Sequence, residues 1–205
     1  NPEYFSVFKV SLYYFVATFI QLGIALYFAT ILTFKVKFAN FWKGILFFPY
    51  LLNGVAIGFI FLYFFKAGGT LDTVMTFLGL DSQIQLWLGD RSINNMSLAF
   101  TSIWRYMGFN FIIFLGAIQS IDPEIYEAAE IDGATHLQII LKIKLPLITP
   151  MIVLMTIMSI GNIFKGDFGM IYPFIGDNAL LYPTTDVIDT YVFRALRTFT
   201  NYGRT

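Results

Sequence analysis

Three stretches of this sequence carry no charged side chain and are each long enough to cross a lipid bilayer as a helix. They cover residues 10–34, 44–65 and 145–164, which are 25, 22 and 20 residues long. A bilayer core of about 30 Å takes about 20 apolar residues of helix. A fourth run, residues 96–121, is similar but contains Arg105. The pattern predicts an all-α bundle of four transmembrane helices, because these runs lack the alternation of a barrel strand.

The composition agrees with a chain embedded in lipid and excludes several kinds of site. Of the 205 residues, 57% are hydrophobic and 13% are charged, whereas soluble domains carry about 25% charged residues. The formal net charge is zero, so nothing favours nucleic acid as a partner. Cysteine is absent, which excludes disulfides and thiol nucleophiles, and the single histidine, His136, cannot build a metal site alone. The chain begins with Asn1 and shows no leader pattern, so we expect it to be a fragment of a longer protein.

The polar segments between the runs predict which side of the membrane they face. Residues 35–43 and 122–144 lie on the same side if every run crosses once, and residues 66–95 lie on the other. The first segment carries three lysines, Lys35, Lys37 and Lys43. Short loops rich in lysine and arginine face the cytoplasm, so we place residues 35–43 and 122–144 there. The opposite loop holds Lys66 and Arg91, so the bias in charge is small.

Residues 122–146 hold a polar run whose pattern predicts two short helices joined by a turn, and we call this segment the elbow. Asp122 and Pro123 are typical of a helix start. Gly133 is typical of a helix end, because glycine adopts the left-handed conformation. Thr135 can cap a second short helix, and Pro146 would end the elbow as the chain re-enters the membrane. The second helix would carry four apolar side chains on one flank: Leu137, Ile140, Leu141 and Ile143. Capping alone favours an ordinary surface connection.

The same run resembles the EAA loop of ABC-importer permeases. That loop reads E-A-A, two residues, D-G-A, and then I-x-L-P-x-x-x-P, and every spacing is kept here. The matching residues are Glu127, Ala128, Ala129, Asp132, Gly133, Ala134, Ile143, Leu145, Pro146 and Pro150. One departure is Ile140, where many members of the family have phenylalanine. With so many positions matched, the resemblance outweighs the interpretation as an ordinary connection.

Membership of this family implies a MetI-like fold, a polytopic helical bundle in a bacterial inner or plasma membrane with the elbow on the cytoplasmic side. The elbow is then expected to dock in a cleft of an ATPase subunit through Glu127, Ala128, Ala129, Asp132, Gly133 and Ala134. The implied partners are a second homologous permease, two ABC ATPase subunits, an extracytoplasmic solute-binding protein and the lipid bilayer. This chain would bind no cofactor and be no enzyme, because ATP is hydrolysed on the partner subunits. Residues 1–205 would form a single permease domain that lacks the first and last transmembrane helices of a full subunit.

A second stretch resembles the sugar-uptake branch of the family, represented by permeases of the LplB and MalF types. The resemblance rests on residues 167–172 and 180–191, and it implies transport of a carbohydrate, for which we expect an oligosaccharide. The alternatives are a permease for amino acids or peptides, a membrane enzyme, and a membrane scaffold or channel subunit. The enzyme lacks support, because neither G-x-S-x-G nor H-E-x-x-H occurs in the sequence.

Polar residues in or beside the apolar runs are candidates for a transport path, because an unpaired polar group in lipid is costly. The candidates are Asn53, Arg105, Asn110, Asn162 and Asp167. Aromatic neighbours such as Tyr106 could stack on sugar rings. For Arg105, pairing with a carboxylate or reaching the outer membrane interface is favoured over contact with substrate. Lys165 and Asp167 could form an interfacial charge pair, yet Asn162 and Asp167 rank first as substrate contacts.

Two further patterns concern packing. Gly54 and Gly58 form a G-x-x-x-G pair, which predicts close contact between helices. Near the C-terminus, apolar residues recur at spacings of three and four: Ile188, Tyr191, Val192, Ala195, Leu196 and Phe199. Because Arg194 and Arg197 lie off this face, we predict an amphipathic helix that lies on the membrane or on a partner.

Overall fold

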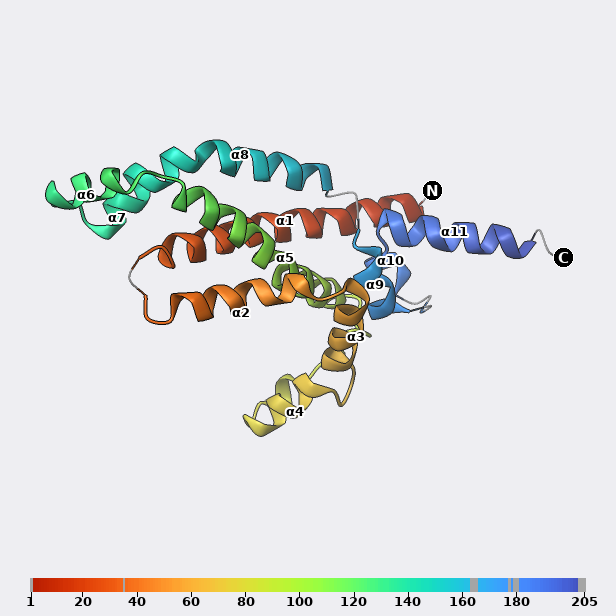
Figure 1. The fold of residues 1–205 in the computed structure, drawn as a ribbon. Helices are drawn as coiled ribbons and strands as arrows, with labels where there is room; N and C mark the ends of the chain where they lie inside the picture. The colour runs from red at the N-terminus through yellow and green to blue at the C-terminus, as the bar shows by residue number, and fades with distance from the viewer. Residues whose placement is uncertain (1, 35, 163–165, 177, 179–180, 203–205) are drawn as a thin grey trace. The chain divides into compact units, whose positions relative to one another are not determined.

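The computed structural model describes residues 2–34, 36–162, 166–176, 178 and 181–202, and within them every regular element is a helix (Figure 1). The predicted all-α class is therefore confirmed. The three longest helices of the described chain are α1 (Pro2–Ile31), α5 (Asn94–Gln119) and α8 (Leu145–Asn162). The others are α2 (Ala39–Leu51), α3 (Gly54–Phe65), α4 (Thr70–Phe77), the 3₁₀ turn η1 (Asp81–Gln83), α6 (Pro123–Ile131), α7 (His136–Ile139), the π-helix η2 (Ile140–Lys144), α9 (Phe168–Ile175), α10 (Tyr182–Thr185) and α11 (Ile188–Tyr202).

Among the described residues, three helical stretches are long and apolar enough to cross a membrane: Leu12–Ile31, Asn94–Gln119 and His136–Gly161. The pair α2 and α3 adds a fourth if it counts as one broken span. This agrees with the four predicted helices, with one correction. The sequence predicts one helix over residues 44–65, but Leu52 and Asn53 are not helical.

Asn53 is the reason for the break between α2 and α3. Its side-chain oxygen accepts a hydrogen bond from the Val55 backbone N–H at 2.9 Å, so it forms the N-cap of α3. A short polar side chain that bonds its own backbone competes with continuation of a helix. Asn53, a candidate for the transport path, is therefore also the residue that ends α2 and starts α3.

The chain forms two compact units. Unit 1 consists of Asn1–Ala17, Leu52–Ser102 and Gly161–Thr205, and unit 2 consists of Thr18–Leu51 and Ile103–Ile160. The long helices α1, α5 and α8 each contribute residues to both units.

In unit 2, α1, α5 and α8 pack together around one apolar core. Ala25 and Ala29 of α1 are fully buried, and such small side chains let neighbouring helices approach closely. α5 contributes Phe111, and α8 contributes Ile148 and Met155. This core therefore packs together α5 and α8, the two helices between which the elbow lies.

In unit 1, α3 packs closely against α9 at Gly58. An ideal Cβ built on Gly58 would lie 2.5 Å from the Met170 carbonyl oxygen and 3.0 Å from Pro173 Cβ. No side chain larger than a hydrogen fits there unless one of the two helices moves. The close packing predicted from the G-x-x-x-G pair is confirmed at this glycine.

Gly58→Ala is expected to lower the free energy of unfolding by about 1–3 kcal/mol, the usual cost of forcing atoms into a filled contact. Unfolding of the purified protein by heat or denaturant measures the effect. Gly116→Ala in α5 is the matched control, because a Cβ there meets nothing within 4 Å. Equal stability of the two variants would contradict the close contact of α3 with α9.

Candidate functional site

The first helix of the elbow starts as the sequence predicts. The Asp122 side chain accepts a hydrogen bond from the Glu124 backbone N–H at 3.0 Å, and Pro123 takes the first helical position of α6, where a missing N–H costs nothing. The Tyr126 hydroxyl donates to the Ile118 carbonyl at 3.3 Å, which joins α6 to the end of α5. Partial burial raises the pKa of the Tyr126 hydroxyl, so this group stays protonated and able to donate.

The turn of the elbow is closed by two backbone hydrogen bonds. Gly133 N–H donates to the Glu130 carbonyl at 3.0 Å, and Ala134 N–H donates to the Ala129 carbonyl at 2.9 Å. Gly133 has a φ of 76°. This pair of bonds around a left-handed glycine is a Schellman ending, as expected from the Asp-Gly sequence. The turn is thus rigid without help from any distant residue.

The second half of the elbow begins as predicted but ends differently. Thr135 Oγ1 accepts from the Gln138 N–H at 3.3 Å, and Gln138 Oε1 accepts from the Thr135 N–H at 2.7 Å, which is a capping box. The prediction of a separate short helix ended by Pro146 is wrong. α7 instead continues through η2 into α8, and Pro146 lies within α8. Local π-helical geometry is one way in which membrane helices accommodate proline.

The side chains that the second half buries also differ from the predicted flank. Leu137 and Leu141 are 63% and 55% exposed, whereas Ile139 is 2% exposed. The predicted flank assumed an isolated α-helix with a regular repeat. The π-helix changes that repeat, so the buried face runs through Ile139.

The elbow presents small, acidic and apolar groups to solvent. Of the six predicted docking residues, Ala129 is buried and Ala134 is half-buried. The other four are exposed: Glu127, Ala128, Asp132 and Gly133. Three apolar side chains nearby are also exposed: Ile125, Ile131 and Leu137. Exposed apolar groups gathered on one short element are typical of an interaction surface. The sequence argument missed Ile131, which is 86% exposed, although an apolar residue beside a turn in a polar run was a visible signal.

In unit 1 the predicted path residues Asn53 and Asp167 both cap helices. The Asp167 side chain accepts from the Met170 N–H at 3.2 Å and is the N-cap of α9. The two capped ends lie close together, because an ideal Cβ on Gly169 would be 4.0 Å from the Val55 backbone nitrogen. Two helix N-termini thus share one region, and the N-terminus of a helix carries partial positive charge. The Asn162 side chain and Lys165 lie outside the described residues.

In unit 2 the predicted path residues Arg105 and Asn110 lie on α5 but on different sides of it. Five residues in an α-helix correspond to a rotation of about 140° from the starting direction. Asn110 is buried, and Arg105 is half-buried with its guanidinium carbon 5.1 Å from the centre of the Tyr106 ring. A cation over an aromatic face is attractive, so Tyr106 helps to hold this charge.

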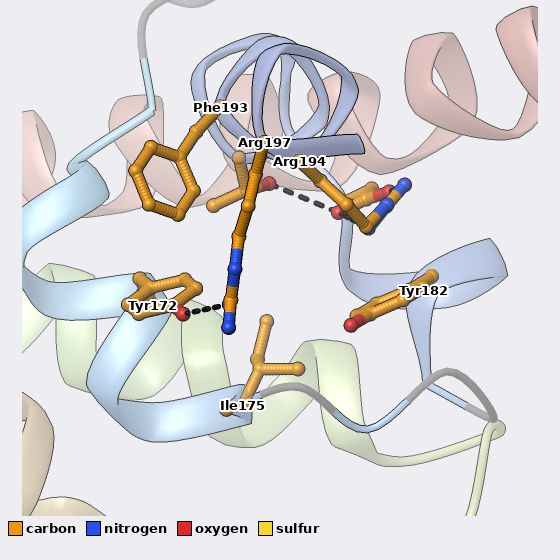
Figure 2. A pocket seen from close by; sticks show the side chains of 9 residues that line it. Tyr172, Ile175, Tyr182, Phe193, Arg194 and Arg197 are labelled. Carbon is orange, nitrogen blue, oxygen red and sulfur yellow. Dashed lines mark hydrogen bonds and ion pairs between the residues drawn. The ribbon is translucent and has the colours of Figure 1, made fainter. Parts of the chain in front are cut away.

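A pocket that the sequence argument did not predict lies among α9, α10 and α11 in unit 1 (Figure 2). It is lined by Tyr172, Ile175, Gly176, Tyr182, Asp186, Thr190, Phe193, Arg194 and Arg197. The Arg197 guanidinium donates to the Tyr172 hydroxyl at 3.3 Å, and the Arg194 guanidinium lies 3.7 Å from the centre of the Tyr182 ring. The lining therefore combines aromatic faces with two cations and one carboxylate.

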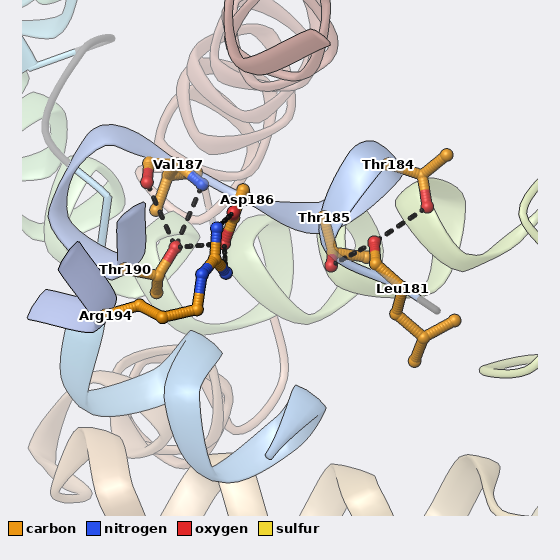
Figure 3. Close-up of polar contacts among 7 residues, drawn as sticks. All are labelled: Leu181, Thr184, Thr185, Asp186, Val187, Thr190 and Arg194. Atoms are coloured by element: carbon orange, nitrogen blue, oxygen red, sulfur yellow. Dashed lines mark hydrogen bonds and ion pairs between the residues drawn. The ribbon is translucent and has the colours of Figure 1, made fainter. Parts of the chain in front are cut away.

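The wall of this pocket is held by a partly buried ion pair (Figure 3). Arg194 donates hydrogen bonds to both oxygens of Asp186, one of them at 2.9 Å, and the Thr190 hydroxyl donates to the same carboxylate at 3.0 Å. Burial lowers the pKa of the Arg194 guanidinium, but the hydrogen bonds and charge of Asp186 outweigh it and raise the pKa overall. The ion pair fastens α11 to the segment before it.

The exposed apolar side of the C-terminal helix is consistent with the predicted amphipathic helix. The helix itself is confirmed as α11, and its Arg194 side faces the protein. The apolar residues Ile188, Val192 and Leu196 are exposed, and the Phe199 side chain lies outside the described residues. Their contact with a membrane or a partner stays a prediction.

The comparison with protein families identifies the class of protein. Residues 21–197 match the family described as "Binding-protein-dependent transport system inner membrane component". The chain therefore belongs to this family, and the resemblance inferred from the elbow and the C-terminal stretch is confirmed at that level. With its long apolar helices, it is a multi-pass protein of the cell membrane.

The chain is also similar to individual relatives and to a solved structure. The chain is 34% identical over 165 residues to the arabinooligosaccharides transport system permease protein AraP of Bacillus subtilis, with 79% of this chain and 53% of the relative covered. The corresponding protein of Halalkalibacterium halodurans is 30% identical over 172 residues, covering 80% and 53%. The chain thus spans about half the length of these relatives. A bacterial ABC transporter involved in the import of the acidic polysaccharide alginate has a TM-score of 0.86 at 25% identity, covering 98% of this chain and 71% of that one.

Proposed function

We propose that this chain is part of a permease subunit of an ATP-driven ABC importer that moves an oligosaccharide across the bacterial cell membrane. The family match over residues 21–197 supports transport. Relatives named for arabinooligosaccharides and for polygalacturonan and rhamnogalacturonan support a carbohydrate as the solute. The observation that carries the mechanism is the exposed, rigid elbow between α5 and α8.

The elbow is proposed to dock on an ATPase subunit and to pass its movement to the membrane helices. A lever of this kind must keep its shape, and the caps at Asp122 and Thr135 together with the Gly133 turn provide this. It must also be connected to the membrane helices without long flexible linkers. Three residues, 120–122, separate α5 from α6, and α7 continues into α8.

The partners follow from this role. A solute-binding protein outside the membrane delivers the sugar, and a second permease completes the path, because one set of helices cannot enclose it. Two ATPase subunits close on ATP and move both elbows, so that the paired permeases alternate between inward-open and outward-open states. ATP is hydrolysed on those subunits, and this chain supplies the path and the lever.

The sugar path is proposed to use five polar residues: Asn53, Arg105, Asn110, Asn162 and Asp167. The adjacent caps Asn53 and Asp167 support this most directly, because polar groups at two neighbouring helix ends can bond hydroxyl groups of a sugar. Labelled oligosaccharide uptake in cells that lack the subunit distinguishes a sugar from an amino acid or a peptide as the solute.

Glu127→Ala is expected to weaken binding of the ATPase subunits at least about tenfold, as truncation of a central interface residue does. Co-purification of the ATPase subunits with the full permease measures the effect. Glu124→Ala is the control, because Glu124 is exposed on the same helix but outside the EAA pattern. Unchanged co-purification of both variants would contradict docking through Glu127.

A further inference from the structure

A buried lysine lies where the elbow joins α8. The Lys144 side chain is 3% exposed, and burying a charged group is costly unless other groups compensate it. Its ammonium donates to Thr33 Oγ1 at 2.6 Å and lies 3.6 Å from the centre of the Phe34 ring. In the part of the chain that the structure describes, no carboxylate forms an ion pair with this ammonium.

The surroundings of Lys144 bring the elbow and the end of α1 together. Thr33 and Phe34 follow α1. Tyr126 of α6 has its ring centre 5.4 Å from the ammonium, and the His136 ring of α7 lies 4.6 Å from the Phe34 ring. We call these five residues the Lys144 cluster. Residues of α6, α7 and η2 thus converge on two residues that are about 90 or more positions away in the sequence.

The π-helix explains why a lysine occupies this inward position. In a regular α-helix, residue i+5 is about 140° out of phase with residue i. In η2 the Leu145 N–H bonds to the Ile140 carbonyl, five residues back, and this wider turn brings Lys144 onto the buried side that Ile139 begins. Ile148 and Met155 continue that side along α8. A shift of one residue in the helical register would have exposed the Lys144 charge.

The cluster joins the elbow to Thr33 and Phe34, the residues that follow α1. The Thr33 hydroxyl donates to the Thr30 carbonyl at 2.6 Å, so its oxygen lone pairs are left to accept from Lys144. A cation held by a hydroxyl and an aromatic face in a buried place is a strong, directional contact. A chain that needed only apolar packing here would bury a methionine or leucine at lower cost.

We propose that Lys144 is a positioning residue that links the elbow to α1, so that movement of α6 and α7 shifts α1 together with α8. The inference rests on the proposed function, because it gives the movement of the elbow a route into a helix that is not its neighbour in sequence. The two helices then respond as one body when an ATPase subunit pulls on the elbow.

The test uses the full permease assembled with its partner permease and ATPase subunits. A spin label is attached at Tyr27→Cys, an exposed position on α1, and its spectrum is recorded with and without ATP. In the otherwise wild-type assembly, ATP is expected to change the spectrum. Lys144→Met should lose this change while the ATPase subunits still co-purify, and Lys144→Arg should restore it. Lys142→Met, at an exposed lysine of the same segment, is the matched control and should keep the change.

The outcomes separate this inference from the proposed function. An ATP-dependent change that persists in Lys144→Met, or a wild-type assembly in which the α1 label never responds, overturns the inference alone. Failure of the wild-type permease to bind ATPase subunits overturns the proposed function and this inference with it. If Lys144→Met does not assemble, Phe34→Leu decides, because it removes the ring and leaves the hydrogen bond of Lys144 to Thr33. Loss of the ATP response in Phe34→Leu supports the link, and an unchanged response overturns it.

Discussion

Gly133→Val is expected to abolish most ATP-driven uptake while the ATPase subunits continue to hydrolyse ATP. Gly133 has a φ of 76°, and a β-branched residue is strained in this left-handed region, at a cost of about 1–2 kcal/mol. A Cβ at this position would meet nothing within 4 Å, so the strain comes from the backbone alone. Valine therefore favours another turn, and the two backbone bonds that set the angle between α6 and α7 are lost.

Uptake of a labelled oligosaccharide and ATP hydrolysis, measured in the same liposomes, report the effect of the valine. Gly133→Asn is the matched control, because asparagine tolerates the left-handed conformation, and it should retain most of the uptake. An importer that takes up sugar normally with valine at this position would show that the angle of the elbow is not what moves the helices.

Asp186→Ala is expected to lower the free energy of unfolding by about 3 kcal/mol, the lower end of the range for removing one partner of a buried ion pair. The Asp186 side chain is 6% exposed and the Arg194 side chain 29%, so water offsets part of the loss on the arginine. The substitution leaves the Arg194 charge half-buried without its carboxylate. Thermal unfolding of the purified permease measures the change.

A double variant separates the ion pair from simple loss of packing. Asp186→Ala combined with Arg194→Leu removes both charges, and it should be more stable than Asp186→Ala alone, because no uncompensated charge remains. Strictly additive losses from the two substitutions would show that the pair contributes no coupling energy to the attachment of α11.

Local features of this structure were predictable from the sequence, because each depends on a few adjacent residues. The spans follow from apolar runs, and the caps at Asp122 and Thr135 follow from side chains that bond N–H groups two or three residues away. The turn at Gly133 follows from one backbone conformation. The break at Asn53 was missed, although it is also local, because an apolar run gives no hint of where a polar side chain turns back on its own backbone.

Features that join distant segments were not predictable. The Lys144 ammonium bonds to Thr33, 111 residues away in sequence, and nothing near either residue indicates the other. The amphipathic pattern of α11 predicted the helix correctly, but it could not reveal that Asp186 would hold Arg194 against the protein. The assignment of a sugar path stays a prediction for the same reason, since its candidates come from separate segments.

The π-helix between the turn and α8 sets which side chains of this segment face the protein. If Ile140–Lys144 kept its length but formed a regular α-helix, Lys144 would lie about 140° from Ile139 and its ammonium would turn away from Thr33. Deleting one residue between Ile139 and Lys144 would remove the extra residue of the π-helix, and the lysine would then follow Ile139 by four residues and stay on the buried side. An insertion of one residue would instead require a second wide turn to keep it there. Natural variation in length here is accordingly expected as the loss of one residue and not as a gain.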